Sequence, residues 1–436
     1  MTDLISPGDL TALRRIGDPD LDGKVAASPD RSLRTAAQAG KLFAGGQAGP
    51  DLPLPDVPKP SVSPEGQKLL HAQRLFVKHG NEIGGALLLA ALPQSYAARW
   101  GAGALVASSG LHNDFRQRII GTAQFLLLVT RGAATEREAC KMWTPGYQPG
   151  GELDPPWKAC HVLRTYHARI RHELDQRAHT EPRVKELLGD HNEPPLNQED
   201  LLAMLLTFTV SVFEVIERCG IAWSTDEQEA YLHLWDVIGA HLGIGTPAVT
   251  AKLSTDLQAR MQAEGWVGLR PPTVAATRRL LDQLRRRLWW RDGNGTREDP
   301  WAAPRPGQVL THALLAEMAH AMPPRMRSVP QLAVRKLAPP VVRDALLLGG
   351  GGLVSSLAEI LPGLPIVEDH YAPPGYTNPV DARVTRLMVN EVTRHVVVHF
   401  LRTGRLALPG LEDWSDGLVE NGGGDQPRRP PRVVHG

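Results

Sequence analysis

The sequence predicts a mainly α-helical protein, of a globin-like-to-bundle type, whose helices are joined by Pro- and Gly-rich connections. Along most of the chain, apolar residues recur at the three- and four-residue spacing of one helix face. No segment shows the convincing alternation of apolar and polar residues that a half-buried strand requires. The 436 residues are 42% hydrophobic and 22% charged, values that are typical of an ordinary globular protein.

Three regions follow from the composition. Residues 1–64 are rich in Asp, Pro, Gly, Ser and Ala, and residues 51–64 carry closely spaced prolines, so we expect an extended N-terminal lead-in. From Glu65 the pattern becomes helical, and residues 65–410 are predicted to form a single α-helical domain. Residues 411–436 contain Gly and Pro-Arg runs and are predicted to be a flexible C-terminal tail.

Helical periodicity marks ten segments, two of which carry capping signals. The segments are 66–91, 114–130, 157–178, 197–220, 224–243, 247–264, 273–291, 307–321, 327–338 and 380–404. The first is expected to end before Pro93, because proline interrupts helix hydrogen bonding. Asn197 is a predicted N-cap with Gly220 as the stop, and Ser224 with Glu227 has the spacing of a capping box.

Charge and cysteine content narrow the classes of function. The net charge of +1 gives no field that would attract nucleic acid, so no nucleic-acid partner is expected. A local cluster of arginines is interpreted as a solvated helix face. It comprises Arg278, Arg279, Arg285, Arg286, Arg287 and Arg291. The three cysteines form neither a disulfide framework nor a CxxC pair, which fits a reducing compartment.

The N-terminus lacks the pattern of an export signal, and no stretch is apolar over the length of a membrane span. We therefore expect a cytoplasmic protein with no transmembrane segment.

The most informative stretch runs from His161 to Arg171. At 100° per residue it places His167 inside an apolar stripe, with Arg164 and Arg171 together on its shoulder. The stripe is formed by Leu163, Tyr166, Ile170 and Leu174. Such an imidazole could ligate a haem iron while the arginines pair with propionates or a polar substrate group. From spacing alone, a core histidine beside surface arginines is the simpler interpretation.

A second helical stretch places Arg118 and Thr122 on one face, because they are four residues apart. Gly121 lies between them, inside a predicted helix, where glycine costs roughly 1 kcal/mol relative to alanine. This glycine either permits close helix packing or leaves room for a flat macrocycle or a gas molecule.

A competing constellation lies near the C-terminus. Glu391, His395 and His399 follow one another at single-turn spacing, a row that could hold a non-haem metal in a helical bundle. The other interpretation is a polar stripe on a C-terminal helix. No Glu-x-x-His element elsewhere in the sequence completes a di-iron site, which favours the polar stripe.

Read together, several short runs resemble the latex-clearing-protein (rubber oxygenase) and MpaB-type oxygenase family of b-type haem proteins. The runs are 17–23 (GDPDLDG), 91–96 (ALPQSY), 118–122 (RIIGT), 164–171 (RTYHARIR), 197–201 (NQEDL), 229–235 (EAYLHLW) and 239–244 (GAHLGI). The similarity covers about residues 10–243 and extends more loosely into the C-terminal helices. The Arg-x-x-His-x-x-x-Arg element and its order relative to the other runs carry it.

The resemblance implies an oxidoreductase that binds haem b and dioxygen and cleaves or oxidises a C=C bond of an apolar, isoprenoid-type small molecule or polymer. It implies His167 as the proximal iron ligand, and Arg164 and Arg171 as pocket arginines that contact the cofactor. Arg118 and Thr122 would line the distal side, and these two residues with Arg164 are the expected catalytic residues.

The chain departs from the family pattern at one position. In rubber-cleaving members a lysine precedes the distal threonine, and Gly121 stands at that place here, so a lysine-ligated state is not available. Besides the non-haem metal site, a non-catalytic haem- or lipid-binding helical protein is the remaining alternative.

Overall fold

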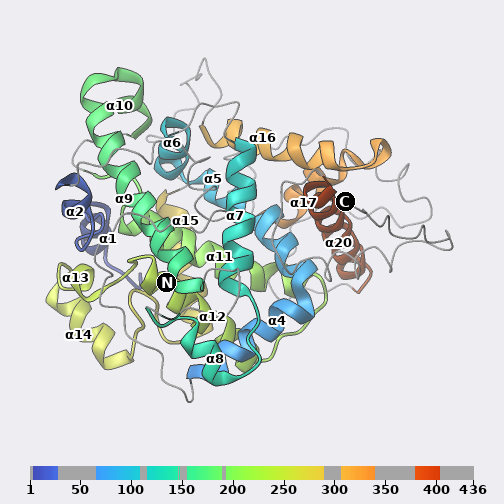
Figure 1. The fold of residues 1–436 in the computed structure, drawn as a ribbon, viewed down its shortest axis with the longest axis horizontal. Helices are drawn as coiled ribbons and strands as arrows, with labels where there is room; N and C mark the ends of the chain where they lie inside the picture. Colours follow the sequence, from blue (N-terminus) through green and yellow to red (C-terminus); the bar gives the residue numbers. More distant parts are fainter. Residues whose placement is uncertain are drawn as a thin grey trace, which may run out of the picture.

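The predicted all-α fold class is confirmed by the computed structural model (Figure 1). The residues that the structure describes are 3–27, 65–108, 115–145, 147, 155–188, 193–288, 306–338 and 379–402. Within these ranges the chain forms helices and no β-strand, apart from one isolated bridge between Val267 and Arg270. None of the helices in the described part is long and apolar enough to cross a bilayer.

The helices of the first part of the chain are α1 (Pro7–Arg14), α2 (Asp22–Ala27), α4 (Glu65–Ala86), the π-helix η1 (Leu87–Ala91), α5 (Leu92–Ala97), α6 (Arg99–Ala107), α7 (Phe115–Thr130), α8 (Glu136–Lys141) and α9 (Pro156–Thr180). Those of the second part are α10 (Pro182–Leu188), α11 (Gln198–Arg218), α12 (Thr225–His241), α13 (Pro247–Thr250), α14 (Thr255–Glu264), α15 (Val274–Leu288), α16 (Pro306–Ala321), the 3-10 helix η2 (Pro324–Met326), α17 (Val329–Leu337) and α20 (Pro379–Arg402).

The predicted caps are confirmed. The side chain of Asn197 accepts a hydrogen bond from the backbone N–H of Asp200 at 3.0 Å and opens α11. Ser224 and Glu227 form a reciprocal capping box at the start of α12. Gly220 follows α11 with a φ of +72°, a left-handed conformation that favours glycine. Short-range hydrogen bonding therefore sets these helix ends.

The expected helix end before Pro93 is wrong. The chain widens into the π-helix η1, and the N–H of Leu92 donates to the carbonyl of Leu87 five residues earlier. Pro93 then occupies the first turn of α5, where its missing N–H removes no required hydrogen bond. π-helical turns are frequent at functional sites. This one leads into α5, which lines the cavity described below.

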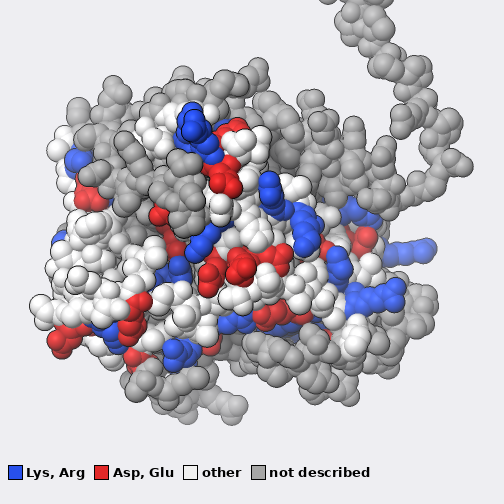
Figure 2. Space-filling model, turned by 90° about the horizontal axis from the view of Figure 1, so that it is seen from below, with Lys and Arg blue, Asp and Glu red and all other residues white. Residues whose placement is uncertain are grey.

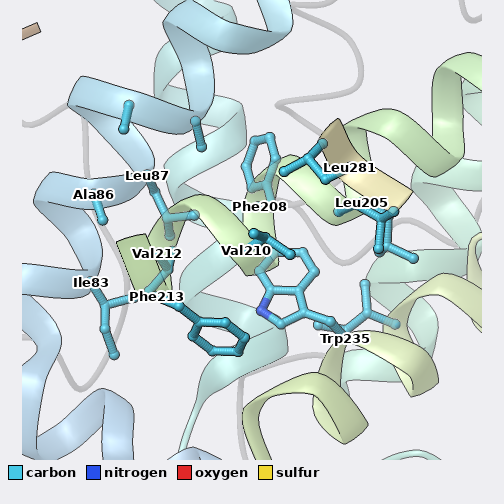
Figure 3. Packing of buried hydrophobic residues seen from close by; sticks show 14 of the residues in the cluster. Ile83, Ala86, Leu87, Leu205, Phe208, Val210, Val212, Phe213, Trp235 and Leu281 are labelled. Atoms are coloured by element: carbon cyan, nitrogen blue, oxygen red, sulfur yellow. The ribbon is translucent and has the colours of Figure 1, made fainter. Parts of the chain in front are cut away.

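Helix α11 is the centre of the core. Nearly all of its residues are buried, and it packs against α1, α4, η1, α12 and α15. Figure 3 shows its Val212 and Phe213 beside Ile83 and Leu87 of α4 and η1. A helix that is buried on all sides fits its almost unbroken apolar sequence, so α11 acts as the support against which the other helices pack.

The predicted extended lead-in is wrong for its described part. Residues 7–14 and 22–27 are helical, and Leu10 and Leu13 are 2% and 0% exposed. Helix α1 packs on α11, and α2 packs on α9. Leu10 and Leu13 have helical spacing behind a Ser6 cap, a local signal that the Pro-rich composition of the region concealed. Residues 28–64 and the predicted tail at 411–436 lie outside the described residues.

The interpretation of the arginine cluster as a solvated face is wrong in part: Arg279 and Arg286 are exposed, three other arginines bind carboxylates of α11, and Arg291 lies outside the described residues. Arg285 of α15 is 5% exposed and binds both carboxylate oxygens of Glu214 on α11, at 2.9 and 3.1 Å. Arg278 and Arg287 pair with Glu217 and Glu199 of the same helix. Figure 2 shows basic and acidic side chains lying among one another on the described part of the surface. Because the acidic partners of these three arginines lie on the buried helix α11, part of the arginine cluster faces the core and not the solvent.

Breaking the Arg285–Glu214 pair should destabilise the protein strongly. Burial alone would raise the pKa of Glu214, but the Arg285 charge and its hydrogen bonds lower it overall. Arg285→Ala would leave this carboxylate buried without its cation, so we expect a loss of about 3–5 kcal/mol in the free energy of unfolding. Urea denaturation followed by circular dichroism measures it.

The matched control is Asp282→Ala. This carboxylate also binds Arg285, at 3.0 Å, but its side chain is 55% exposed. Its loss should cost no more than about 1 kcal/mol. Equal effects of the two substitutions would contradict the role given to the buried pair.

Candidate functional site

A cavity of about 230 Å³ lies among α5, α6, α7, α9, α11, α12 and α16. On this measure a single water needs about 10–15 Å³, so the space is far larger than an ordinary packing defect. Its wall is mostly apolar, and its described lining residues include no Lys, Arg, Asp or Glu. Apolar surroundings with a few polar groups are typical of a small-molecule or cofactor site.

Helix α9 presents two different faces, and one of them forms a wall of the cavity. Leu163, Tyr166, His167 and Ile170 line the cavity, and Leu174 continues the same stripe as a fully buried residue. The apolar stripe read from the sequence therefore exists, and His167 lies within it. Residue spacing alone did not show what this stripe faces, and the structure shows that it faces the cavity.

The imidazole of His167 is held in its neutral form. Burial, with a smaller effect of the Arg171 charge, lowers the pKa of His167 to about 3. Its Nδ1 is buried and has no hydrogen-bond partner among the described residues. A neutral imidazole can bind a metal ion through a ring nitrogen. His167 is the only histidine among the described residues of the cavity wall.

Helix α7 supplies another part of the wall. Gly121 and Thr122 both line the cavity, and a Cβ added at Gly121 would meet no atom within 4 Å. Gly121 is therefore not a close-packing contact with a neighbouring helix, and its missing side chain leaves space open. Arg118 lies one turn earlier in α7, but its side chain is outside the described part of the structure.

The face of α9 next to this stripe carries the two predicted pocket arginines, and neither lines the cavity. Arg164 is 1% exposed, and its Nε and Nη2 donate to Asp18 at 2.5 and 2.7 Å. Its Nη2 also donates to Asp20 at 2.9 Å. Arg171 donates to Asp22 at 2.9 Å and to the carbonyl of Leu196 at 3.0 Å.

These contacts correct the expectation that Arg164 and Arg171 pair with a propionate or a substrate. Their positive charge is balanced by carboxylates of the N-terminal segment, which lies more than 140 residues earlier in the chain. The aspartates belong to the GDPDLDG run described above. The sequence alone did not show that they pair with Arg164 and Arg171. Both arginines therefore position α9 and are not groups of the cavity wall.

The ion pairs of Arg164 and Arg171 with Asp18, Asp20 and Asp22 form what we call the N-terminal ion-pair cluster. Gln198 and Gly243 adjoin this cluster, and the sequence did not predict their roles. Gln198 donates to the carbonyls of Gly17 and Gly243 at 2.8 and 3.0 Å. Gly243 has a φ of +80°, and a Cβ there would lie 2.4 Å from Nε of Arg164. Only glycine fits this close approach, so the end of α12 and the start of α11 are both bound to the ion pairs.

The competing metal row at the C-terminus does not form a site. Glu391 binds Arg394 at 2.7 Å and contacts His395 at 3.4 Å, whereas the ring of His399 packs edge-on against His320. Nowhere in the described ranges do three His, Cys, Asp or Glu side chains come together as metal ligands would. The polar-stripe interpretation of this row therefore agrees better with the structure.

The open space at Gly121 gives a stability prediction. Gly121→Ala should raise the free energy of unfolding of the ligand-free protein by up to about 1 kcal/mol, because alanine favours the helix and its methyl group meets no neighbour. The matched control is Gly85→Ala in α4, whose Cβ would lie 2.4 Å from Val389. That substitution should instead cost about 1–3 kcal/mol. A loss of stability in Gly121→Ala would show that the position is packed.

The neutral state of His167 gives a pH prediction. The unfolded chain binds a proton near pH 6.5, and the folded protein only near pH 3. Between these values the unfolded state holds one more proton, so this residue lowers the free energy of unfolding as pH falls, by about 1.4 kcal/mol per pH unit. In urea titrations of the ligand-free protein, His167→Gln should show a correspondingly weaker pH dependence. Parallel curves for the two proteins would contradict the burial of a neutral imidazole.

Comparison with known proteins identifies the family. A model described as "ER-bound oxygenase mpaB/B'/Rubber oxygenase, catalytic domain" matches residues 78–355. No curated protein matches the chain. The fold is similar to a solved structure described as "Structure of Latex Clearing Protein LCP in the closed state", with 19% identity, a TM-score of 0.55 and coverage of 88% of this chain and 90% of that chain. Because the family match spans more than half of the sequence, the chain belongs to the mpaB/rubber oxygenase family of oxygenases.

Proposed function

We propose that this protein is a haem b-dependent oxygenase that uses dioxygen to oxidise or cleave a C=C bond of an apolar, isoprenoid-type substrate. The single observation that carries the proposal is the neutral His167 imidazole in the wall of an apolar cavity. Membership in an oxygenase family supports the reaction class.

The residues of the cavity fit a haem group. His167 offers a ring nitrogen without a protein partner, and Gly121 leaves its part of the α7 wall open. Flat apolar side chains such as Phe125 and Phe208 line the same space and suit a porphyrin ring. The haem, when bound, would supply the chemistry of dioxygen activation, and His167 would hold its iron.

The other wall residues act on the substrate and on water. The apolar wall favours an apolar substrate and excludes water, so polar competitors are not stabilised. The hydroxyl of Thr122 is a hydrogen-bond donor in the wall of α7, at the position that the family resemblance assigns to the distal side. Arg118, four residues earlier, is proposed to serve the same side.

The N-terminal ion-pair cluster has an indirect role in this scheme. Arg164 lies three residues before His167 and Arg171 four residues after it, and both are bound to aspartates of the first segment. These contacts fix the rotation of α9 and keep His167 directed into the cavity. Arg164 and Arg171 are therefore positioning residues in our proposal.

Haem binding by His167 is tested by ultraviolet–visible spectroscopy. The purified protein from haem-replete cells should show a Soret band that shifts after dithionite and carbon monoxide, because His167 would be the one protein ligand of the iron in our proposal. His167→Ala should lose most of this band, since the iron loses its protein ligand. Consumption of oxygen with isoprenoid alkenes then tests the reaction.

The matched control is His172→Ala, on the same helix. The ring of His172 contacts Gln176 at 3.0 Å and does not line the cavity, so this variant should retain the band. Full loading of His167→Ala would overturn the assignment of the ligand. A bound haem that is six-coordinate and inert to oxygen would instead indicate a non-catalytic haem-binding protein.

A further inference from the structure

A series of oxidisable aromatic rings leads away from the cavity along α12. Trp235 lines the cavity, and its ring centroid lies 6.2 Å from that of Tyr231. The Tyr231 ring in turn lies 5.4 Å from that of Trp223, which precedes the helix. From Thr225 to Trp235 the helix rises about 15 Å, at about 1.5 Å per residue. The three rings therefore bridge the cavity wall and the far end of α12.

All three rings are buried, and the last of them adjoins an exposed residue. Tyr231 is 0% exposed and Trp235 is 4% exposed, whereas Trp223 is 7% exposed and adjoins the exposed Ala222. Phe213 packs against both Trp223 and Tyr231, with centroids 5.9 and 5.5 Å away. Figure 3 shows Phe208, Trp235 and Phe213 near one another in this part of the core.

Packing alone explains a cluster of aromatic residues, but not the choice of residue types. Tyr and Trp carry a polar N–H or O–H into the core, which Phe or Leu would not. Nε1 of Trp223 is buried and has no hydrogen-bond partner among the described residues. The property that these two residue types add to a core is an accessible one-electron oxidation, which Phe lacks.

We infer that Trp235, Tyr231 and Trp223 form a relay that carries oxidising equivalents out of the cavity. This inference rests on the proposed function, because the haem proposed for the cavity would supply the oxidant. An oxidant left without substrate would otherwise damage the residues of the cavity wall. Electron transfer slows steeply with distance, so transfer through a series of tilted rings in close contact is faster than one long step.

The charge balance of the relay is simple. Trp235 loses one electron, and the oxidant in the cavity gains it. An electron from Trp223 then restores Trp235, with Tyr231 as the bridge, and leaves Trp223 as an indole radical cation. The Tyr231 hydroxyl donates to the carbonyl of Phe208 at 3.3 Å, which is too weak a base to take its proton. Tyr231 therefore keeps its proton and is not the final site of oxidation.

A base for the final site lies next to it. The His79 ring centroid is 6.0 Å from that of Trp223, and Nε2 of His79 is buried with no partner among the described residues. Burial and the Lys78 charge lower the pKa of His79, so its ring is neutral near pH 7. Neither Nε1 of Trp223 nor Nε2 of His79 has a hydrogen-bond partner among the described residues, so the two are not bonded directly, and the proton of the oxidised indole would pass to His79 through a water between them. A thiolate or another one-electron donor in solution then returns an electron to Trp223, and His79 returns the proton.

The test uses haem-loaded, full-length protein treated with hydrogen peroxide in the absence of substrate. Electron paramagnetic resonance of freeze-quenched samples should show an indole radical in the unsubstituted protein. In Trp223→Phe and Trp235→Phe this signal should fall, and the Soret band should bleach severalfold faster, because the oxidant stays in the cavity. Circular dichroism and haem content establish that both variants fold and load.

The matched control is Trp266→Phe. This indole lies outside the ring series and donates to Glu264 at 2.8 Å, so its loss should change neither the radical nor the bleaching rate. If loaded Trp223→Phe and Trp235→Phe both behave like the unsubstituted protein, the relay is wrong and the proposed oxygenase function stands. If the unsubstituted protein takes up no haem, both proposals fail together.

Discussion

The ion pairs between Arg164 and the aspartates of the N-terminal segment are the interaction on which the site depends. Arg164 is almost fully buried, and a buried guanidinium is tolerated only when its charge is balanced and most of its donors are bound. Asp18 and Asp20 meet that need. Because Arg164 and His167 are three residues apart on one helix, fixing the first fixes where the second points.

This constraint divides α9 into two faces with opposite requirements. One face must be apolar, since it borders a cavity whose described wall holds no charged carboxylate, guanidinium or ammonium group. The other must be charged, since it receives the aspartates of the first segment. A helix can satisfy both only because its side chains project in all directions around one axis. The neutral imidazole of His167 is the consequence, because burial of its ring and the charge of Arg171 both lower its pKa.

Ion pairs between residues far apart in the sequence also hold the helices around α11. Its buried carboxylates bind arginines of α15, and Arg285 also reaches Gln94 of α5 at 2.6 Å. Helix α5 begins after the π-turn and contributes Ser95 and Tyr96 to the cavity wall. Charged contacts remote from the cavity thus hold the helices that form it. The cavity itself can then remain apolar and open without collapsing.

The site and the aromatic series share one helix pair. Phe208 of α11 and Trp235 of α12 line the cavity, and their rings lie 5.7 Å apart. Bulky rigid rings keep this wall in shape, and in our proposal they also protect the cofactor. Structural and redox roles are compatible because both need the rings to be close and immobile.

The sequence by itself determined the helical fold class, most helix positions, the caps at Asn197 and Ser224, and the place of His167 in an apolar stripe. These features depend on hydrogen bonds and side-chain spacing within a few residues, which the order of amino acids states directly. Only the tertiary structure decided that Arg164 and Arg171 face aspartates rather than the cavity, that Arg285 turns inward, and that the chain continues past Pro93. The two ion pairs join residues 146 and 71 positions apart, and such partners are chosen by the packing of whole helices, which local periodicity does not contain.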